Sequence, residues 1–253
     1  MSLTLKFGLA NSINTVTAYI MKQFGPHAVV DLAKKIGIQS KILAVPSLCL
    51  GTFDLSVYEM VGAYSSFANK GVWVEPTYIL RIEDKNGNVI FNSHPKTREA
   101  LSEETAFKMV ELLSGIAAYG PIIKGEKTYG TGIRLRSSAK PYGNIPYSIK
   151  IAGKTGTTQN QSDGWFIGVV PNLVTGVWVG GEDRATHFKS ITQGQGATMA
   201  LPIWALYHKK IYADSTLNVS QGEFERPEDL SIEVDCGKKG DQAIKQLEED
   251  PQF

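Results

Sequence analysis

The stretch from residue 149 to residue 180 constrains the fold of this chain more than any other. It holds three short apolar segments in succession, Ile149–Thr157, Trp165–Val170 and Val174–Val179, each of a length typical of a β-strand. The last two are separated only by Pro171-Asn172-Leu173, a natural hairpin connection. The pattern therefore predicts three strands, the last two forming an antiparallel hairpin.

Helical patterns flank these strands on both sides. Apolar residues at three- to four-residue spacing predict helices over Leu9–Ile36 (broken at Gly25-Pro26), Leu55–Asn69, Ser102–Ala118 and Met199–Tyr212. Ser56 followed by Glu59 is a capping-box pattern, which fixes the start of the second helix. With the strands, these segments predict an α+β domain.

Two other segments have turn chemistry. Tyr78–Ile82 and Val89–Phe91 flank Asn86-Gly87-Asn88, which predicts a hairpin. The stretch Gly120–Pro146 is rich in Gly, Ser and Pro and is predicted to be a loop. We expect residues 1–213 to form one domain and the polar residues 214–253 to be a mobile extension or the start of another module.

The composition excludes several classes of protein. The chain has 253 residues, of which 42% are hydrophobic and 20% charged, as in ordinary globular proteins. Its net charge of +1, with acids and bases interspersed, gives no electrostatic basis for binding nucleic acid or a membrane surface. No apolar run is long enough for a transmembrane helix.

Cysteine and histidine give no sign of a metal site or of any other cofactor. Cys49 lies in an apolar run and is expected to be a buried free thiol, whereas Cys236 lies in the polar tail. The histidines lack metal-ligand spacing and are far apart: His27, His94, His187 and His208.

The segment Gly153-Lys154-Thr155-Gly156-Thr157-Thr158 carries the strongest chemical signal. Lys154 supplies a positive charge, and the hydroxyls of Thr155 and Thr157 can donate to a carboxylate. Because Gly156 has no side chain, a ligand could lie against the strand backbone there. A backbone N–H of this strand could also stabilise a developing oxyanion. The segment therefore suits carbonyl chemistry on an anionic substrate.

Nucleotide binding is a competing interpretation that the spacing disfavours. Gly-Lys-Thr also ends the P-loop pattern, but that pattern needs a glycine where this chain has Ser148. Gly130-Thr131-Gly132 begins a dinucleotide fingerprint that Leu135 interrupts. A strand that simply ends in a Gly-Thr turn is the plainest alternative.

A second motif, Ser12-Ile13-Asn14, lies upstream in the first predicted helix. Alone it is a weak signal, since Ser is a common helix cap. Ser-x-x-Lys, Ser-Asp-Asn and Lys-Thr-Gly are together the signature of penicillin-binding proteins and class A β-lactamases. With the long block from Ala152 to Gly180, the chain from about residue 5 to residue 212 resembles the transpeptidase domain of class A penicillin-binding proteins, which have an antiparallel sheet flanked by helices.

The resemblance implies a peptidoglycan D,D-transpeptidase, in which a serine attacks the D-Ala-D-Ala end of a stem peptide and β-lactams trap the acyl-enzyme. It implies that Ser12 relays protons and that Asn14 binds the substrate amide. Lys154 would hold Ser12, and Thr155 and Thr157 would bind the terminal carboxylate. The resemblance places the parent protein at the extracytoplasmic face of the bacterial membrane, membrane-anchored and joined to a glycosyltransferase domain.

The chain departs from the family pattern at its beginning. The family's Ser-x-x-Lys precedes Ser-x-Asn by several dozen residues, and no such motif precedes Ser12 here. The later matches, Ser93-His94-Pro95-Lys96 and Ser137-Ser138-Ala139-Lys140, come in the wrong order and outside predicted helices. We therefore expect this chain alone to be inactive, to lack N-terminal strands of the sheet and to self-associate. A serine β-lactamase-like hydrolase and a non-catalytic sensor module on the same fold remain alternatives.

Overall fold

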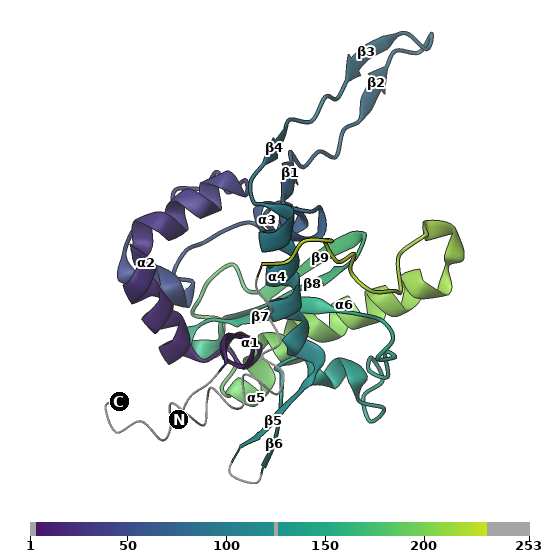
Figure 1. The fold of residues 1–253 in the computed structure, drawn as a ribbon. Coiled ribbons are helices and arrows are strands. Elements are labelled where there is room, and N and C mark those ends of the chain that lie inside the picture. Colours follow the sequence, from purple (N-terminus) through teal and green to yellow (C-terminus); the bar gives the residue numbers. More distant parts are fainter. Residues whose placement is uncertain (1–3, 124–125, 232–253) are drawn as a thin grey trace.

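The centre of the molecule is a three-stranded antiparallel sheet. The computed structural model describes residues 4–123 and 126–231. The sheet has the order β7-β8-β9 and consists of β7 (Ala152–Thr157), β8 (Asp163–Val170) and β9 (Leu173–Gly180) (Figure 1). These strands confirm the prediction, with β7 beginning three residues later than expected because Ile149–Ile151 precede the ladder.

One face of the sheet is covered by α6 (Gly196–Ala213), which follows the short α5 (Ile191–Gly194) (Figure 1). Trp204 of α6 is fully buried and meets the ring of Phe166 edge-on, with 5.3 Å between the ring centroids. Gly168 makes this contact possible, since a Cβ there would lie 2.4 Å from the Trp204 ring. The largest cluster of buried apolar side chains forms around Trp204.

The opposite face carries α1 (Leu5–Ala10), α3 (Val57–Ala68) and α4 (Glu103–Leu113), and α4 continues as a 3-10 turn over Ser114–Ala117. Val169 of the sheet packs with Val110 and Leu113 of α4. The capping box of Ser56 and Glu59 begins α3 as predicted. Helices on both faces of an antiparallel sheet confirm the predicted α+β fold.

The predicted first helix is divided twice. The chain turns at Ser12 between α1 and α2 (Asn14–Lys35), and α2 bends at Gly25, whose φ of 76° is not helical. Pro26 follows this bend, as the sequence indicated. A 3-10 helix then spans Pro46–Leu50 and contains Cys49, a free thiol that is half-buried instead of buried.

Small hairpins and ladders surround the central sheet. The predicted hairpin is present as β2 (Arg81–Glu83) and β3 (Val89–Asn92) and projects from the body of the molecule (Figure 1). The pair β1 (Val72–Val74) and β4 (Thr97–Glu99) at its base was not predicted.

The predicted loop over Gly120–Pro146 is wrong in part. It contains a hairpin of β5 (Tyr119–Ile123) and β6 (Glu126–Tyr129), and then a 3-10 turn over Ile133–Arg136. Gly120 and Pro121 suggested a loop, but they lie where the register of the hairpin shifts between Tyr119 and Ile122. Such a bulge tolerates Gly and Pro within a strand.

The first part of the predicted C-terminal extension lies against the domain. After a 3-10 turn over Ser215–Leu217, the side chain of Asn172 donates to the carbonyl of Asn218 at 2.8 Å and accepts from the Ser220 N–H at 2.8 Å. The predicted domain boundary at residue 213 stays a prediction. Cys236, expected in the polar tail, lies outside the described residues. In the described part of the chain, no helix combines the length and apolarity needed to cross a bilayer.

Candidate active site

A left-handed turn presents Ser12 at the surface. The Ser12 N–H donates to the Leu9 carbonyl at 3.2 Å and the Ile13 N–H to the Gly8 carbonyl at 2.9 Å, which ends α1. Ser12 itself has a φ of 52°, a backbone conformation that costs a non-glycine residue roughly 1 kcal/mol. The chain therefore turns at Ser12 and does not continue the helix, and the Ser12 side chain is exposed.

Lys154 reaches Ser12 from the middle of β7. Strand alternation places Lys154 on the same face as its cross-strand partner Ile167, the face that α3 and α4 cover. The Lys154 ammonium donates a hydrogen bond to the Ser12 hydroxyl and another, of 3.0 Å, to the Thr155 carbonyl. The strand and the Ser12-Ile13-Asn14 segment that the sequence singled out therefore meet.

Lys154 has an unusual electrostatic environment. Burial lowers the pKa of its ammonium from 10.5 to about 8, because the charged form loses hydration there. None of the ion pairs found among the described residues includes Lys154. Its charge is thus without a protein counter-ion in this part of the chain and is available to an anionic ligand.

The two threonines alternate with Lys154 along β7. The Thr155 hydroxyl lies 2.9 Å from the Thr131 hydroxyl, and the Thr157 hydroxyl accepts a 3.1 Å hydrogen bond from the Gly196 N–H at the start of α6. Because the Thr157 oxygen is the acceptor in that bond, its own proton is still available for donation.

Gly156 and Asn14 complete the set of predicted residues. A Cβ on Gly156 would lie 3.0 Å from the Cβ of its partner Trp165, so the absent side chain relieves crowding on that face. Asn14 is the first residue of α2 and is exposed, and its side-chain amide makes no hydrogen bond to any residue that the structure describes. Asn14 is connected to the site through its position two residues after Ser12.

The other chemical candidates lie elsewhere. Ser93 follows the projecting hairpin, and Ser137 begins a turn in which the Lys140 N–H donates to the Ser137 carbonyl at 3.4 Å, so neither serine is on a helix. Over residues 4–123 and 126–231, no group of three or more potential metal ligands comes together. Sequence reasoning missed Thr131, whose contact with Thr155 depends on tertiary structure.

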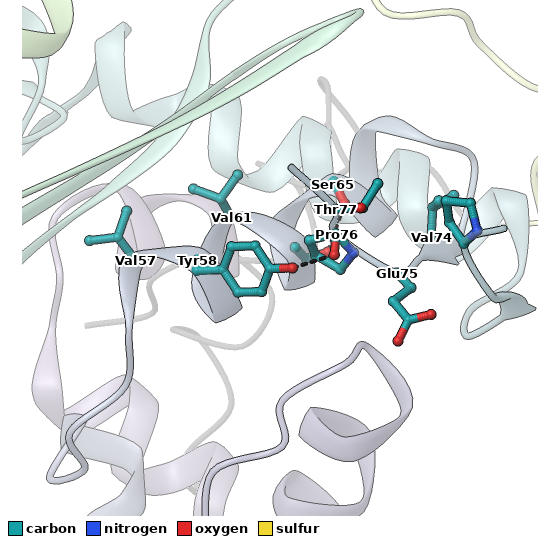
Figure 2. A pocket seen from close by; sticks show the side chains of 10 residues that line it. Val57, Tyr58, Val61, Ser65, Val74, Glu75, Pro76 and Thr77 are labelled. Atoms are coloured by element: carbon teal, nitrogen blue, oxygen red, sulfur yellow. Dashed lines mark hydrogen bonds between the residues drawn. The ribbon is translucent and has the colours of Figure 1, made fainter. Parts of the chain in front are cut away.

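An apolar pocket of about 520 Å³ lies between α3 and the segment that leads into the hairpin. Figure 2 shows Val57, Tyr58 and Val61 on one side of it, with Tyr58 donating a hydrogen bond to the Pro76 carbonyl. None of the predicted site residues lines this pocket. We therefore do not assign it to the site around Lys154.

Comparisons with known proteins identify the family of the chain. Residues 1–187 match the family model described as "Penicillin binding protein transpeptidase domain". The chain is 32% identical over 210 residues to penicillin-binding protein 1A of Aquifex aeolicus, covering 83% of this chain and 26% of that protein. It is 33% identical over 203 residues to penicillin-binding protein 2D of Bacillus subtilis, covering 80% and 27%. The chain thus spans about a quarter of the length of these relatives.

Solved structures show the same architecture. Penicillin-binding protein 1A of Haemophilus influenzae superposes with a TM-score of 0.72 at 25% identity, over 88% of this chain and 36% of that one. PonA1 of Mycobacterium tuberculosis, solved in complex with penicillin V, shares the fold with a TM-score of 0.66 at 21% identity, over 89% and 59%. On the match of sequence and fold together, this chain belongs to the penicillin-binding protein transpeptidase family and has the penicillin-binding fold.

Proposed function

We propose that this chain is the C-terminal part of a D,D-transpeptidase domain and that its parent protein cross-links bacterial peptidoglycan. In that reaction a serine attacks the carbonyl of a stem peptide ending in D-Ala-D-Ala, the terminal D-Ala leaves, and an amine of a neighbouring stem resolves the acyl-enzyme. The observation that carries the proposal is the hydrogen bond from the Lys154 ammonium to the Ser12 hydroxyl.

The proposed roles combine what the family resemblance implies with the contacts of Ser12, Lys154 and the threonines. Ser12 relays a proton between the leaving amine and the enzyme, because a lysine whose pKa is about 8 exchanges protons readily near neutral pH. Lys154, Thr155 and Thr157 bind the terminal carboxylate of the substrate. Asn14 binds the substrate amide, and the Thr157 N–H supplies one half of the oxyanion hole beside Gly156.

The parent would act at the extracytoplasmic face of the bacterial membrane, where peptidoglycan lies, and would carry an upstream Ser-x-x-Lys that supplies the nucleophile. The 253-residue chain has no Ser-x-x-Lys before Ser12. We therefore propose that this chain binds the substrate end but forms no acyl-enzyme.

One experiment tests acylation. The chain is incubated with a fluorescent penicillin and analysed on a denaturing gel, and we expect no labelled band. A stable serine-linked adduct would overturn the proposed inactivity. With the parent protein, sustained hydrolysis of the β-lactam would indicate a β-lactamase-like enzyme instead, and binding without transfer would indicate a sensor.

A second experiment tests the substrate end directly. Two peptides, N-acetyl-D-Ala-D-Ala and its C-terminal amide, are titrated into the chain and followed by amide NMR shifts. We expect the carboxylate to bind several-fold more tightly than the amide, and Lys154→Met to abolish that preference. Lys150→Met is the matched control, because Lys150 on the same segment pairs with Glu223 at 3.4 Å and is half-exposed. Equal binding of the two peptides by the unaltered chain would contradict the proposal.

We also propose that the chain self-associates through the free edge of β9. Within the described residues β9 pairs with β8 alone, so its other edge presents unpaired backbone groups. Trp178 on β9 is 41% exposed, which adds an apolar surface beside that edge.

A further inference from the structure

We propose that Thr131 is a positioning residue that orients the Thr155 hydroxyl toward a carboxylate ligand and joins the two halves of the site. The inference deepens the proposed function and rests on it, because it concerns how the same site recognises the D-Ala-D-Ala terminus. Its basis is a set of contacts that neither the motif pattern nor the family resemblance assigned to Thr131.

The backbone around Thr131 is held on both sides. Its own N–H donates to the carbonyl of Ala10 at 3.0 Å, two residues before Ser12. The preceding N–H of Gly130 and the following N–H of Gly132 donate to Ala118 at 3.0 Å and Ile116 at 2.9 Å. The half-buried Thr131 therefore has a fixed position relative to the turn that presents Ser12.

Close approach fixes this segment further. A Cβ on Gly130 would lie 2.3 Å from the carbonyl oxygens of Gly115 and Ile116, so only glycine fits at that point. The Thr131 side chain then extends from an anchored backbone to β7, where its hydroxyl lies 2.9 Å from that of Thr155. Thr131 thus contacts both the segment before Ser12 and the strand that carries Lys154.

The direction of this hydroxyl pair matters for binding. Each hydroxyl has one proton and can accept as well as donate. If Thr155 donates to Thr131, its proton is no longer available to a ligand. If Thr131 donates to Thr155, the Thr155 proton is free and the chain of donors runs from Thr131 through Thr155 to a carboxylate oxygen. An anion therefore selects the second arrangement, and the two bonds polarise each other.

The charge of the ligand terminus decides how much the Thr131 hydroxyl contributes to binding. An uncharged amide terminus accepts a weaker hydrogen bond than a carboxylate, so it gains less from an oriented Thr155 proton. Removing the Thr131 hydroxyl should therefore reduce the preference for the acid over the amide by roughly three- to tenfold, the effect of one hydrogen bond. A purely structural role of Thr131 would weaken the binding of both peptides equally.

The test measures dissociation constants of N-acetyl-D-Ala-D-Ala and its amide for the 253-residue chain by amide NMR titration. Thr131→Val removes the hydroxyl with little change in shape, and Thr131→Ser retains it. Thr97→Val, in the exposed strand β4, is the matched control. We expect Thr131→Val to lose preference for the acid, and Thr131→Ser and Thr97→Val to keep it within about twofold.

The outcomes separate this inference from the proposed function. If the unaltered chain does not prefer the acid, the proposed function fails and the role of Thr131 fails with it. If the unaltered chain prefers the acid and Thr131→Val does so equally, the inference alone is overturned. If Thr131→Val does not fold, Thr131→Ala takes its place, since alanine removes the hydroxyl without added bulk. The acid preferences of the unaltered chain and of Thr131→Ala then decide between the same two outcomes.

Discussion

The Lys154 ammonium donates a hydrogen bond to the Ser12 hydroxyl across 142 residues of sequence. Ser12 lies in an exposed left-handed turn, whereas Lys154 extends from a sheet strand and is half-buried. The exposed Ser12 hydroxyl thus replaces part of the hydration that the Lys154 ammonium loses in the rest of the site. This pairing explains how a lysine can remain in the site at a lowered pKa without a carboxylate beside it.

Lys154→Met should stabilise the fold at neutral pH. Burial lowers the pKa of Lys154 to about 8, below its value of 10.5 in an unfolded chain, so the unfolded state binds more protons between these values. The free energy of unfolding of the unaltered chain should therefore rise with pH from about 8 to 10.5. We expect Lys154→Met to be about 1 to 2 kcal/mol more stable at pH 7, with the difference shrinking as the pH rises.

Urea unfolding of both chains between pH 7 and pH 10 checks this expectation. The difference between their free energies of unfolding isolates Lys154, because the contributions of all other titrating groups are the same in both chains and cancel. The carbon NMR signal of the Lys154 side chain gives its pKa directly. A measured pKa of Lys154 near 10.5, as for a fully hydrated lysine, would contradict the buried environment assigned to it.

Ser12→Gly should be more stable than Ser12→Ala. Both changes remove the hydroxyl that accepts from Lys154, but glycine adopts the φ of 52° without steric cost. We expect a difference of about 0.5 to 1 kcal/mol in the free energy of unfolding, after allowing for the greater freedom of glycine in the unfolded chain. Chemical denaturation measures it, and an alanine variant more stable than the glycine variant would exclude the left-handed turn.

His208 should make the fold sensitive to mild acid. Its ring is fully buried, stacked on Trp204 with 3.7 Å between centroids, and its Nε2 lies 3.2 Å from the Thr175 hydroxyl. Burial lowers the pKa of His208 from 6.5 to about 4, so between these values the unfolded state binds a proton that the folded state does not. Stability should fall by about 2 kcal/mol between pH 7 and pH 5 from this group.

His208→Gln should remove that part of the pH dependence, whatever it does to stability at pH 7. His187→Gln, at an exposed histidine, is the control and should keep the full dependence. If the pH profiles of unfolding for His208→Gln and the unaltered chain run parallel, His208 is not the group that responds.

Trp178→Lys should reduce self-association. A charged side chain beside the free edge of β9 opposes pairing with a second copy and removes exposed apolar surface. Light scattering over a range of concentrations should show oligomers of the unaltered chain and a shift toward monomer in the variant. Tyr19→Lys, at a residue of α2 that is 65% exposed, controls for a general loss of aromatic surface. An unaltered chain that stays monomeric at high concentration contradicts the proposed association.

Local sequence signals predicted the parts of the fold that depend on neighbouring residues. The capping box of Ser56 and Glu59 and the bend at Gly25 are visible because each acts within one helical turn. The strands β8 and β9 are visible because a short connection joins two apolar segments. The meeting of Ser12 with Lys154 was expected only from the family resemblance, since no local pattern relates residues so far apart.

The features that were missed depend on distant contacts or on irregular strands. The pair β1 and β4 has only three residues in each strand, and β4 is polar (Thr97–Glu99), so the apolar β1 (Val72–Val74) has no recognisable partner in the sequence. The hairpin of β5 and β6 was obscured by Gly120 and Pro121 at its bulge. Thr131 gave no signal, because its function depends on where its hydroxyl lies and not on the residues beside it.

The distance in sequence between the two halves of the site has a consequence for folding. Lys154 loses hydration and meets Ser12 only after α1, the turn behind it and the central sheet have all come together. A partly folded chain would leave this lysine in water with an ordinary affinity for protons. The pKa of this one side chain therefore reports whether α1, the turn at Ser12 and the central sheet have assembled.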